Sequence, residues 1–444
     1  MVLLHIGIDD TDSARGGCTT YIAALLVERL AEIVRFIDYP LLVRLNPNIP
    51  WKTRGNAAVC LRVEAPPDIT QKVKDEVVSL VEEHAEIGQP RTDPGIVFLE
   101  GQVPPDAKVF AKNCLIDVVS KRDSIQLIKK IHAEAIGYGS GRGIIGALAS
   151  IGNLLEEDHT YELLAYRKQE NCGKPREIDE ASVFMMDANT KGRTFNNVDL
   201  ERRRVLITPR GPDPVLLGIR GEAPMDVKEA FRQVVIMEEV ERWVIFRTNQ
   251  GTDMHLPADQ EISSLRSYIT TTLVGVVTEK PRTIRGGHVL FRVGNSSGEV
   301  YCAAYEPSGG FRGVVSRLEV GDHIRISGGV RPRRGRRPIT VNLERLEILN
   351  LAPVLVEHNP TCPFCNKRME SMGRGGGYRC RRCGLKEVNA EPTVMMLPRS
   401  ICPGLYLPPP RAQRHLTKPA VRYGKEKTSF STPVEKFWGL GPNN

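Results

Sequence analysis

The chain contains 444 residues, 41% of them hydrophobic and 26% charged, with a net charge of +8, so it is long enough for about three domains with cores of their own. No apolar run approaches the roughly 18 residues that a membrane-spanning helix needs, and Asp9 and Asp10 interrupt the region where a signal peptide would be apolar. These features exclude membrane-embedded and secreted classes, and we expect a cytoplasmic protein.

The first 130 residues alternate strands and helices. The predicted strands lie at residues 3–8, 41–45, 57–63 and 96–99, and the predicted helices at 20–34 and 73–81. Apolar residues recur at helical spacing in each helix, as Leu26 and Leu30 do in the first. The order strand-helix-strand-strand-helix-strand is that of a ferredoxin-like unit.

Residues 131–258 form a second predicted α+β unit. It opens with the glycine-rich segment 137–143, which precedes an apolar helix at 144–155. The further predicted strands lie at 161–166, 183–186, 205–208, 215–219 and 243–247, with a helix at 226–235. We expect this unit to be ferredoxin-like as well.

Residues 270–350 show strand patterns and almost no helical face. The predicted strands lie at 273–278, 288–293, 300–305, 323–328 and 340–349. Five strands separated by glycine-containing turns favour an oligonucleotide-binding (OB-fold) barrel. The whole chain is therefore predicted to be a multidomain α+β protein.

Basic residues gather in two places. The segment that joins the fourth and fifth barrel strands contains Arg331, Arg333, Arg334, Arg336 and Arg337. Guanidinium groups pair with phosphates, so these arginines predict a contact with nucleic acid. Residues 391–444 form a basic, proline-rich tail in which we expect little regular structure.

Four of the ten cysteines lie in two C-x-x-C pairs. They are Cys362, Cys365, Cys380 and Cys383. Fourteen residues separate the pairs, a spacing that lets four thiolates surround Zn²⁺ tetrahedrally. Because no coordination position stays open, we expect a structural zinc ribbon at 358–390. The other six cysteines are scattered, which favours a reducing compartment over a disulfide framework.

Three carboxylates follow the first predicted strand, at Asp9, Asp10 and Asp12. Carboxylates this close repel one another unless a cation lies among them. A hard-oxygen site for Mg²⁺ carrying a nucleotide phosphate is our interpretation, although an aspartate-rich turn that caps the next helix has the same pattern. Cys18 to Tyr21 then begin that helix, where hydroxyl groups can bind or accept phosphate.

The segment Gly137 to Gly143 can offer backbone amides to phosphates. It is not a Walker-type P-loop, because neither Lys-Ser nor Lys-Thr follows it. Alone it is a weak signal. Together with an acidic metal turn it indicates one element for Mg²⁺ and one for phosphate.

Read in order, these motifs resemble the archaeal isoleucine-tRNA 2-agmatinylcytidine synthetases, the TiaS family. The resemblance is carried by five motifs: GIDDTDS at 7–13, CTTY at 18–21, KTRGNAA at 52–58, SGRGIIGALASIG at 140–152 and NQGTDMHL at 249–256. With the barrel and the zinc ribbon it covers nearly the whole chain, apart from the tail.

The resemblance implies a kinase-like domain at 1–130, a ferredoxin-like domain at 131–258, the barrel and the ribbon. It implies an ATP-dependent ligase that phosphorylates the C2 carbonyl of the cytidine at the first anticodon position of an isoleucine tRNA with a CAU anticodon. The amine of agmatine then displaces the phosphate, and the modified base reads AUA codons. ATP, Mg²⁺ and structural Zn²⁺ would be the cofactors, and tRNA and agmatine the partners.

The resemblance also implies roles for single residues. Asp9, Asp10 and Asp12 would handle Mg²⁺ and phosphate, and Thr19 would be the phosphorylated threonine. The nucleotide phosphates would lie along Ser140, Gly141, Arg142 and Gly143. For the agmatine guanidinium, charge alone favours Asp199, Glu222 and Asp253.

Two other functions compete with this one. A non-catalytic RNA-binding or translation-associated factor explains the barrel and the ribbon but gives the acidic turn no use. A lysidine-type ligase usually carries an S-G-G-x-D-S loop, and the nearest run, at 327–331, lacks the aspartate. Oligomeric state does not follow from the sequence.

Overall fold

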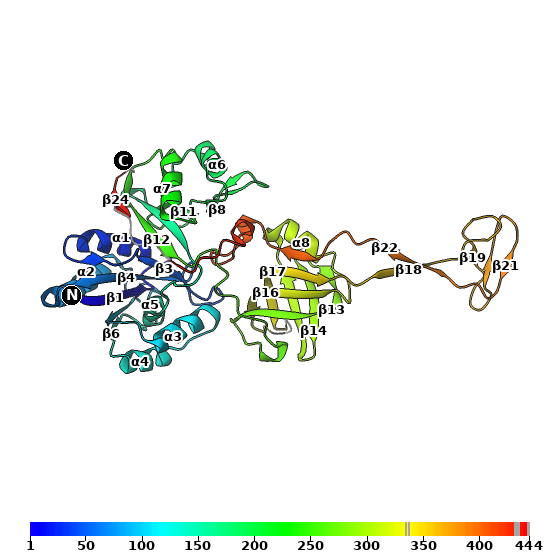
Figure 1. The fold of residues 1–444 in the computed structure, drawn as a ribbon, viewed down its shortest axis with the longest axis horizontal. Coiled ribbons are helices and arrows are strands. Elements are labelled where there is room, and N and C mark those ends of the chain that lie inside the picture. The colour runs from blue at the N-terminus through cyan, green and yellow to red at the C-terminus, as the bar shows by residue number, and fades with distance from the viewer. Residues whose placement is uncertain (334, 336–337, 430–435, 442–444) are drawn as a thin grey trace.

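A computed structural model of the full chain describes residues 1–333, 335, 338–429 and 436–441. The chain forms one large mixed sheet with its helices, a β-barrel beside it, and an arm that ends in a small cysteine-rich unit (Figure 1). Among the described residues, no helix combines the length and apolar composition that crossing a bilayer requires.

The large sheet has 11 strands within the described residues and joins both predicted α+β units. Its main path runs β6-β5-β1-β4-β3-β12-β7-β11-β8, while β2 pairs with β4 and β24 with β12. The bounds are β1 Val2–Asp9, β2 Arg35–Phe36, β3 Leu41–Arg44, β4 Ala57–Ala65, β5 Gly95–Glu100, β6 Glu134–Gly137, β7 Thr160–Arg167, β8 Thr194–Phe195, β11 Val215–Gly221, β12 Val240–Thr248 and β24 Trp438–Leu440. The two units meet where β3 pairs in parallel with β12.

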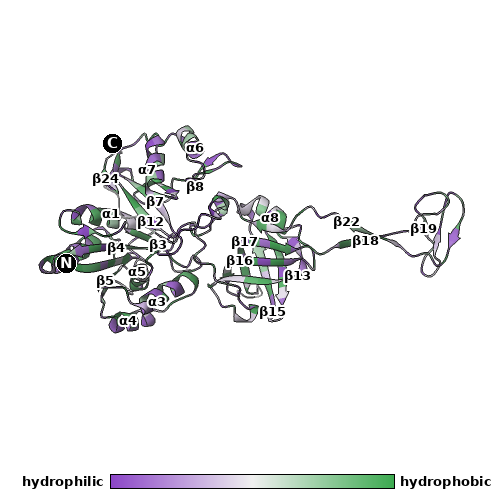
Figure 2. Cartoon of the chain, viewed as in Figure 1, coloured by the Kyte–Doolittle hydropathy of each residue, from purple (hydrophilic) through white to green (hydrophobic). Residues whose placement is uncertain are grey.

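Helices cover both faces of this sheet. Alternation along β1 sends Leu4, Ile6 and Ile8 into the core below α1 and α2, while α5 packs on the opposite face. The helices are α1 Thr19–Leu30, α2 Thr70–His84, α3 Pro105–Ile116, α4 Lys121–Lys130, α5 Gly143–Gly152, α6 Glu180–Asn189 and α7 Pro224–Gln233. Hydrophobic residues run along the strands, while the outward sides of α3 and α4 are hydrophilic (Figure 2).

The predicted strand at 183–186 is wrong, because these residues lie in α6. The side chain of Asp179 accepts hydrogen bonds from the amides of Ala181 and Ser182 and caps the helix. Val183 and Met186 are three residues apart and share its buried face. A short apolar run does not distinguish a strand from such a helix.

The five predicted strands of the barrel are confirmed. They are β13 Thr270–Thr283, β14 Val289–Asn295, β15 Gly298–Ala304, β16 His323–Arg331 and β17 Thr340–Asn350, with the short helix α8 Gly310–Val315. The order β15-β14-β13-β16-β17 closes through a parallel β15–β17 pairing. A two-stranded arm of β18 Val354–His358 and β22 Thr393–Leu397 leads to the cysteine-rich unit, with β19 Glu370–Ser371, β20 Tyr378–Arg379 and β21 Lys386–Glu387.

As expected, the described part of residues 391–444 holds little regular structure, namely the short strands β22, β23 Gly404–Tyr406 and β24 and two short 3-10 helices, but this segment packs against the rest of the protein. After β22 the chain adds β23 to β17, runs back to the large sheet and ends with β24 beside β12 (Figure 1). Arg422 is fully buried there and pairs with Asp158 and Glu222. Arg422 and Lys427, two cations of this basic segment, therefore meet carboxylates beside the large sheet.

Candidate functional site

The acidic turn lies at the carboxyl end of β1, a strand paired on both sides. Asp9 is the last residue of the strand, and Asp10 follows with a left-handed backbone (φ 59°). The amide of Asp10 donates to Oδ1 of Asp9 at 2.7 Å. The carboxylate of Asp9 lies against the helix that covers β1, while Oδ2 of Asp10 accepts the amide of Asp93 at 3.3 Å.

That helix, α5, packs so closely on the sheet that there is no room for a side chain at several glycine positions. A Cβ on Gly7 would lie 2.1 Å from the carbonyl oxygen of Ala147, and one on Gly146 would lie 1.8 Å from Oδ2 of Asp9. A Cβ on Gly143 would meet the amide nitrogen of Gly95 at 2.4 Å. These glycines bring the N-terminus of α5 beside the acidic turn.

Asp93 organises the loop before α5. Its Oδ1 accepts the amide of Ser140 at 2.6 Å, its carbonyl accepts the amide of Gly143 at 3.0 Å, and its carboxylate lies 3.6 Å from Arg142. β6, which leads into this loop, pairs with β5. The glycine-rich segment, expected in a unit that starts at residue 131, thus packs with the first 130 residues.

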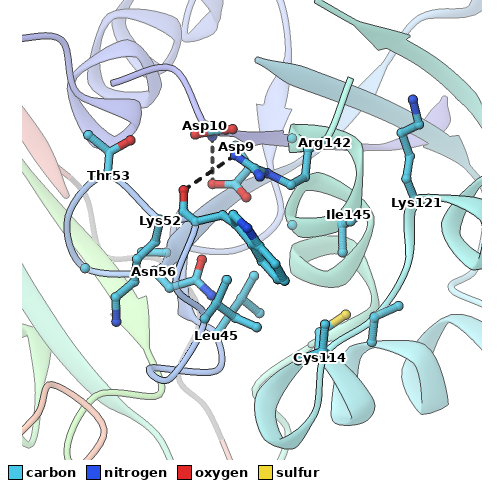
Figure 3. A pocket seen from close by; sticks show the side chains of 18 of the residues that line it. Asp9, Asp10, Leu45, Lys52, Thr53, Asn56, Cys114, Lys121, Arg142 and Ile145 are labelled. Atoms are coloured by element: carbon cyan, nitrogen blue, oxygen red, sulfur yellow. Dashed lines mark hydrogen bonds between the residues drawn. The ribbon is translucent and has the colours of Figure 1, made fainter. Parts of the chain in front are cut away.

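These elements surround a cavity of about 520 Å³, which we call the acidic cavity. Asp9, Asp10 and Arg142 lie together at one end of it, away from Cys114 (Figure 3). The rest of the lining includes a set of mostly apolar residues: Leu45, Ile49, Trp51, Cys114, Val118, Val119 and Ile145. A charged end and an apolar end suit a ligand that joins an anionic chain to a flat ring.

Burial and mutual repulsion disfavour the ionised carboxyl groups of this turn. Burial, followed by the charge of Asp10, raises the pKa of Asp9 well above its usual range. Burial also raises the pKa of Asp10 to about 6, against the effect of Arg142. A cation at the charged end would offset both penalties.

Asp12 is set apart from the other two carboxylates. Its Oδ2 lies 2.9 Å from Nε of Arg54, whose NH1 lies 2.9 Å from Oδ2 of Asp213. Among the described residues, the three aspartates of the turn are not gathered within 4.8 Å of one another. The arrangement fits a cation held by Asp9 and Asp10 better than one shared by all three.

A second cavity, which we call the threonine cavity, lies on the other side of the Asp12–Arg54 pair. Its volume is about 340 Å³, and it shares Asp12, Arg54, Gly55 and Ala57 with the acidic cavity. Thr19 lines it at the start of α1, with Oγ1 3.0 Å from Oγ1 of Thr11. Carboxylates of Glu162 and Asp213 lie opposite, on the second unit.

The structure brings together most of the predicted phosphate-binding residues. Ser140, Arg142 and Gly143 line the acidic cavity, whereas Gly141 is outside its lining and donates its amide to the carbonyl of Tyr138. Thr19 lines the neighbouring cavity instead. The two sets of residues therefore meet at Asp12.

The three carboxylates predicted from charge alone are already paired within the chain. Asp199 lies 2.7 Å from Arg411, and Glu222 lies 2.7 Å from both Arg422 and Lys427. Asp253 lies 3.3 Å from Arg345 and accepts the amide of Lys418. A guanidinium ligand would have to displace these cations.

The four paired cysteines converge, with all four sulfur atoms within 4.8 Å of one another. Zn–S bonds of about 2.3 Å place tetrahedral sulfurs about 3.8 Å apart, and Cys362 and Cys383 are separated by 3.6 Å. The donor set therefore fits Zn²⁺. Of the predicted arginine cluster, Arg331 ends β16 and Arg333 is exposed, while Arg334, Arg336 and Arg337 lie outside the described residues.

Sequence reasoning missed several residues of the two cavities. Arg54, Asp93, Glu162 and Asp213 lie in loops or strands where they resemble ordinary surface charges. Arg54 and its neighbour Lys52 fall inside one quoted motif, KTRGNAA, which is the one signal that points to them. The others become visible only when the two units are placed side by side.

Family models match three parts of the chain. They are described as the TiaS TCKD domain at residues 5–65, the TiaS FLD domain at 141–255 and the TiaS C-terminal zinc ribbon domain at 359–401. The chain is 44% identical to TiaS, the isoleucine-tRNA 2-agmatinylcytidine synthetase of Methanosarcina mazei, covering 94% of this chain and 97% of that protein. It is 43% identical to the TiaS of Pyrococcus horikoshii, covering 98% and 100%.

Two solved structures share the fold over nearly the full chain. One is a complex of TiaS with its isoleucine tRNA and ATP, with 42% identity, a TM-score of 0.87 and coverage of 95% of this chain and 98% of that one. The other is a complex of TiaS with the same tRNA, AMPCPP and agmatine, with 39% identity, a TM-score of 0.84 and coverage of 95% and 98%.

Proposed function

The chain belongs to the TiaS family of isoleucine-tRNA 2-agmatinylcytidine synthetases, and we infer from this that it is an ATP-dependent ligase that joins agmatine to a cytidine of an isoleucine tRNA. One observation carries the assignment within this molecule. The acidic cavity and the threonine cavity meet at Asp12 and Arg54, so a nucleotide on one side and a small amine on the other can reach one base between them.

We propose that ATP occupies the acidic cavity. Its phosphates would lie along Ser140, Arg142 and Gly143, and Mg²⁺ would be held by Asp9 and Asp10. The ion would screen the charge that develops during phosphoryl transfer. The apolar end, with Trp51 and its neighbours, would take the adenine ring.

The reaction needs two steps, because the C2 carbonyl oxygen of cytidine is a poor leaving group. The γ-phosphoryl group of ATP is transferred to that oxygen, which leaves ADP. The primary amine of agmatine then attacks C2 and loses a proton, and inorganic phosphate departs with the former carbonyl oxygen. We assign the target to the cytidine of the first anticodon position, in a CAU anticodon, and Thr19 to a phosphoryl acceptor near the same base.

The threonine cavity is the better place for agmatine. Its lining holds three carboxylates, Asp12, Glu162 and Asp213, and three guanidinium groups, Arg44, Arg54 and Arg220. Agmatine bound there would lie beside the acidic cavity, across Asp12 and Arg54, so its amine could reach a base phosphorylated by the nucleotide. The three carboxylates that charge alone favoured do not line this cavity, and they pair with Arg345 and with Arg411 and Arg422 of the C-terminal segment, by which we mean residues 398–429 and 436–441.

The barrel and the cysteine-rich arm supply the surface for the tRNA in this proposal. The barrel would act as an OB-fold, and the ribbon would hold a structural Zn²⁺ on Cys362, Cys365, Cys380 and Cys383. The arginines at 331, 333, 334, 336 and 337 would contact RNA phosphates. Phosphate contacts set affinity and position, while the cavities select the base.

ATP consumption tests the proposal against a non-catalytic RNA-binding factor. We expect steady ADP release with Mg²⁺, agmatine and a transcript of the isoleucine tRNA together, and little when either the tRNA or agmatine is left out. Asp9→Asn should lower the rate at least about a hundredfold, whereas Asp68→Asn, on the exposed turn before α2, should not change it. Tight tRNA binding without stimulated ADP release would overturn the proposal.

A further inference from the structure

A third cavity, which we call the arginine cavity, adjoins the other two. Its volume is about 400 Å³. It borders the acidic cavity at Lys52 and Asn56, and the threonine cavity at Arg44 and Arg220. Six cations line it, and no aspartate or glutamate among the described residues does. They are Arg44, Lys52, Arg220, Arg331, Arg411 and Arg414.

Half of these charges are neutralised by carboxylates behind the cavity wall. Arg220 lies 3.0 Å from Glu162, Arg411 lies 2.7 Å from Asp199, and Arg414 lies 2.9 Å from Glu344. These pairs fix the orientation of the guanidinium groups.

The other three cations, Arg44, Lys52 and Arg331, form no ion pair with any described residue. Lys52 donates to the carbonyl of Pro47. Arg44 has a buried Nε that finds no hydrogen-bond acceptor in the part of the chain that the structure describes. A buried donor without an acceptor is costly, so this guanidinium lacks the partner that it is placed to meet.

The crowding of positive charge is visible in the acid–base properties of the lining. Burial, then the charges of Arg414 and Arg331, lowers the pKa of Lys52 to about 8. The charge of Arg44, followed by burial, lowers the pKa of His415 well below its usual value. An anion that entered this space would offset the repulsion between the cations, which is one of the two causes in each case.

We propose that the arginine cavity binds a phosphodiester group of the RNA strand that flanks the cytidine under modification. This inference rests on the proposed function. A base held between the acidic and threonine cavities carries its own backbone phosphates with it, and the arginine cavity is the adjoining space that offers unpaired cations. Planar guanidinium groups from separate elements suit a phosphate that must be held in one orientation.

The proposal gives the C-terminal segment a role at the site. Arg411, Arg414 and His415 reach the cavity from that segment, which the buried pairs of Arg422 with Asp158 and Glu222 anchor to the large sheet. The segment crosses between the sheet and the barrel (Figure 1). The phosphate site would therefore form only when sheet, barrel and C-terminal segment are together.

Binding of the isoleucine tRNA over a series of KCl concentrations tests the proposal. We expect Arg44→Gln and Arg331→Gln to weaken binding by about tenfold to a hundredfold and to lower the salt slope by about one phosphate contact. Lys72→Gln removes a charge from the exposed side of α2 and should change neither quantity. Because Arg331 is on the barrel, it gives an independent result if Arg44→Gln does not fold. Unchanged affinity and slope in both variants would overturn the proposal.

A chemically neutral linkage identifies the anion. In an isoleucine tRNA with methylphosphonate at the linkages flanking the target cytidine, wild-type binding should weaken as much as Arg44→Gln weakens it. The two changes together should add no further loss, because they remove the same interaction. If Arg44→Gln instead raises the Kd for ATP and the neutral linkages are harmless, the cavity takes nucleotide phosphate and the proposal is wrong. These binding measurements need no turnover, so they stand apart from a failure of the proposed reaction.

Discussion

Arg54 and Asp12 join the two cavities on which the proposed reaction depends, with Nε of Arg54 2.9 Å from Oδ2 of Asp12. The guanidinium also contacts Asp213 and the carbonyl oxygens of Gly16 and Gly17. It thereby ties the loop after the acidic turn to the second unit.

Arg54→Ala should lower the catalytic rate. Removing the guanidinium leaves Asp12 and Asp213 partly buried and without this partner, so both the geometry and the charge between the cavities change. We expect kcat to fall by at least about a hundredfold, measured as agmatine incorporated per unit time. Arg35→Ala, which breaks an exposed pair with Glu64, is the control and should keep full activity. Equal rates in the two variants would contradict this role.

Gly146→Ala should disrupt the acidic cavity through one methyl group. The added Cβ would lie 1.8 Å from Oδ2 of Asp9, so either Asp9 or α5 must move. We expect loss of ATP binding and a destabilisation of about 1–3 kcal/mol, typical of overpacking. Gly313→Ala adds the same methyl group where no atom lies within 4 Å and should leave ATP titrations unchanged.

The buried Arg422 should matter more for stability than its place near the end of the chain suggests. Its guanidinium lies 2.8 Å from Asp158 and 2.7 Å from Glu222. Arg422→Ala leaves two carboxylates without this cation, which costs about 3–5 kcal/mol for a buried pair. Chemical denaturation should show that loss, whereas Arg29→Ala, which breaks the more exposed pair with Glu76, should cost less than about 1 kcal/mol.

Stability should fall on mild acidification because of His159. Burial lowers the pKa of this histidine to about 4 in the folded protein, whereas it is near 6.5 when the chain is unfolded. Between these values the unfolded chain binds more protons, so the free energy of unfolding decreases as the pH falls from about 6.5 toward 4, by up to about 3 kcal/mol.

The pH dependence can be isolated with two matched substitutions. His159→Gln should make the decrease between about pH 6.5 and 4 less steep in denaturation experiments, because one titrating group is gone while burial still lowers the pKa of His5 to about 4. His132→Gln replaces an exposed histidine and should leave the curve as it is. A His159→Gln curve as steep as wild type would show that other groups cause the decrease.

Zinc removal should unfold the cysteine-rich unit while the sheet and barrel remain folded. The unit is at the end of the arm (Figure 1), and its small core consists of three of the cysteines with Met369, Tyr378 and Leu385. Such a core is too small to stay folded alone. A chelator should release about one zinc per chain and expose four thiols to a thiol reagent, without lowering the main thermal transition. Release of no zinc would contradict the prediction.

Local patterns predicted the elements better than their assembly. β1, β7, β12 and the five barrel strands follow from apolar runs and turns, and the cysteine spacing predicted the cluster. The parallel pairing of β3 with β12 joins residues about 200 positions apart, and no local pattern specifies it. The part of the threonine cavity that Glu162 and Asp213 line depends on that pairing.

The glycine-rich segment is a second case in which the sequence predicted the element but not how it packs in the site. Its glycines predicted a loop that offers amides to phosphate, a role that stays a prediction. The structure adds a packing reason for Gly143 and Gly146, which allow α5 to contact β5 and Asp9. Composition predicted a basic tail with little regular structure, but it does not show that Asp158 and Glu222 lie opposite a cation of that tail.

The most direct test of the central claim is the mass of the modified nucleoside. Purified protein would be incubated with ATP, Mg²⁺, agmatine and a transcript of the isoleucine tRNA with a CAU anticodon, and the digested RNA analysed by mass spectrometry. The account predicts one cytidine heavier by agmatine minus water, at the first anticodon position, absent with Asp9→Asn and present with Asp68→Asn. Unmodified cytidine in a sample that binds the tRNA tightly and is folded would contradict it.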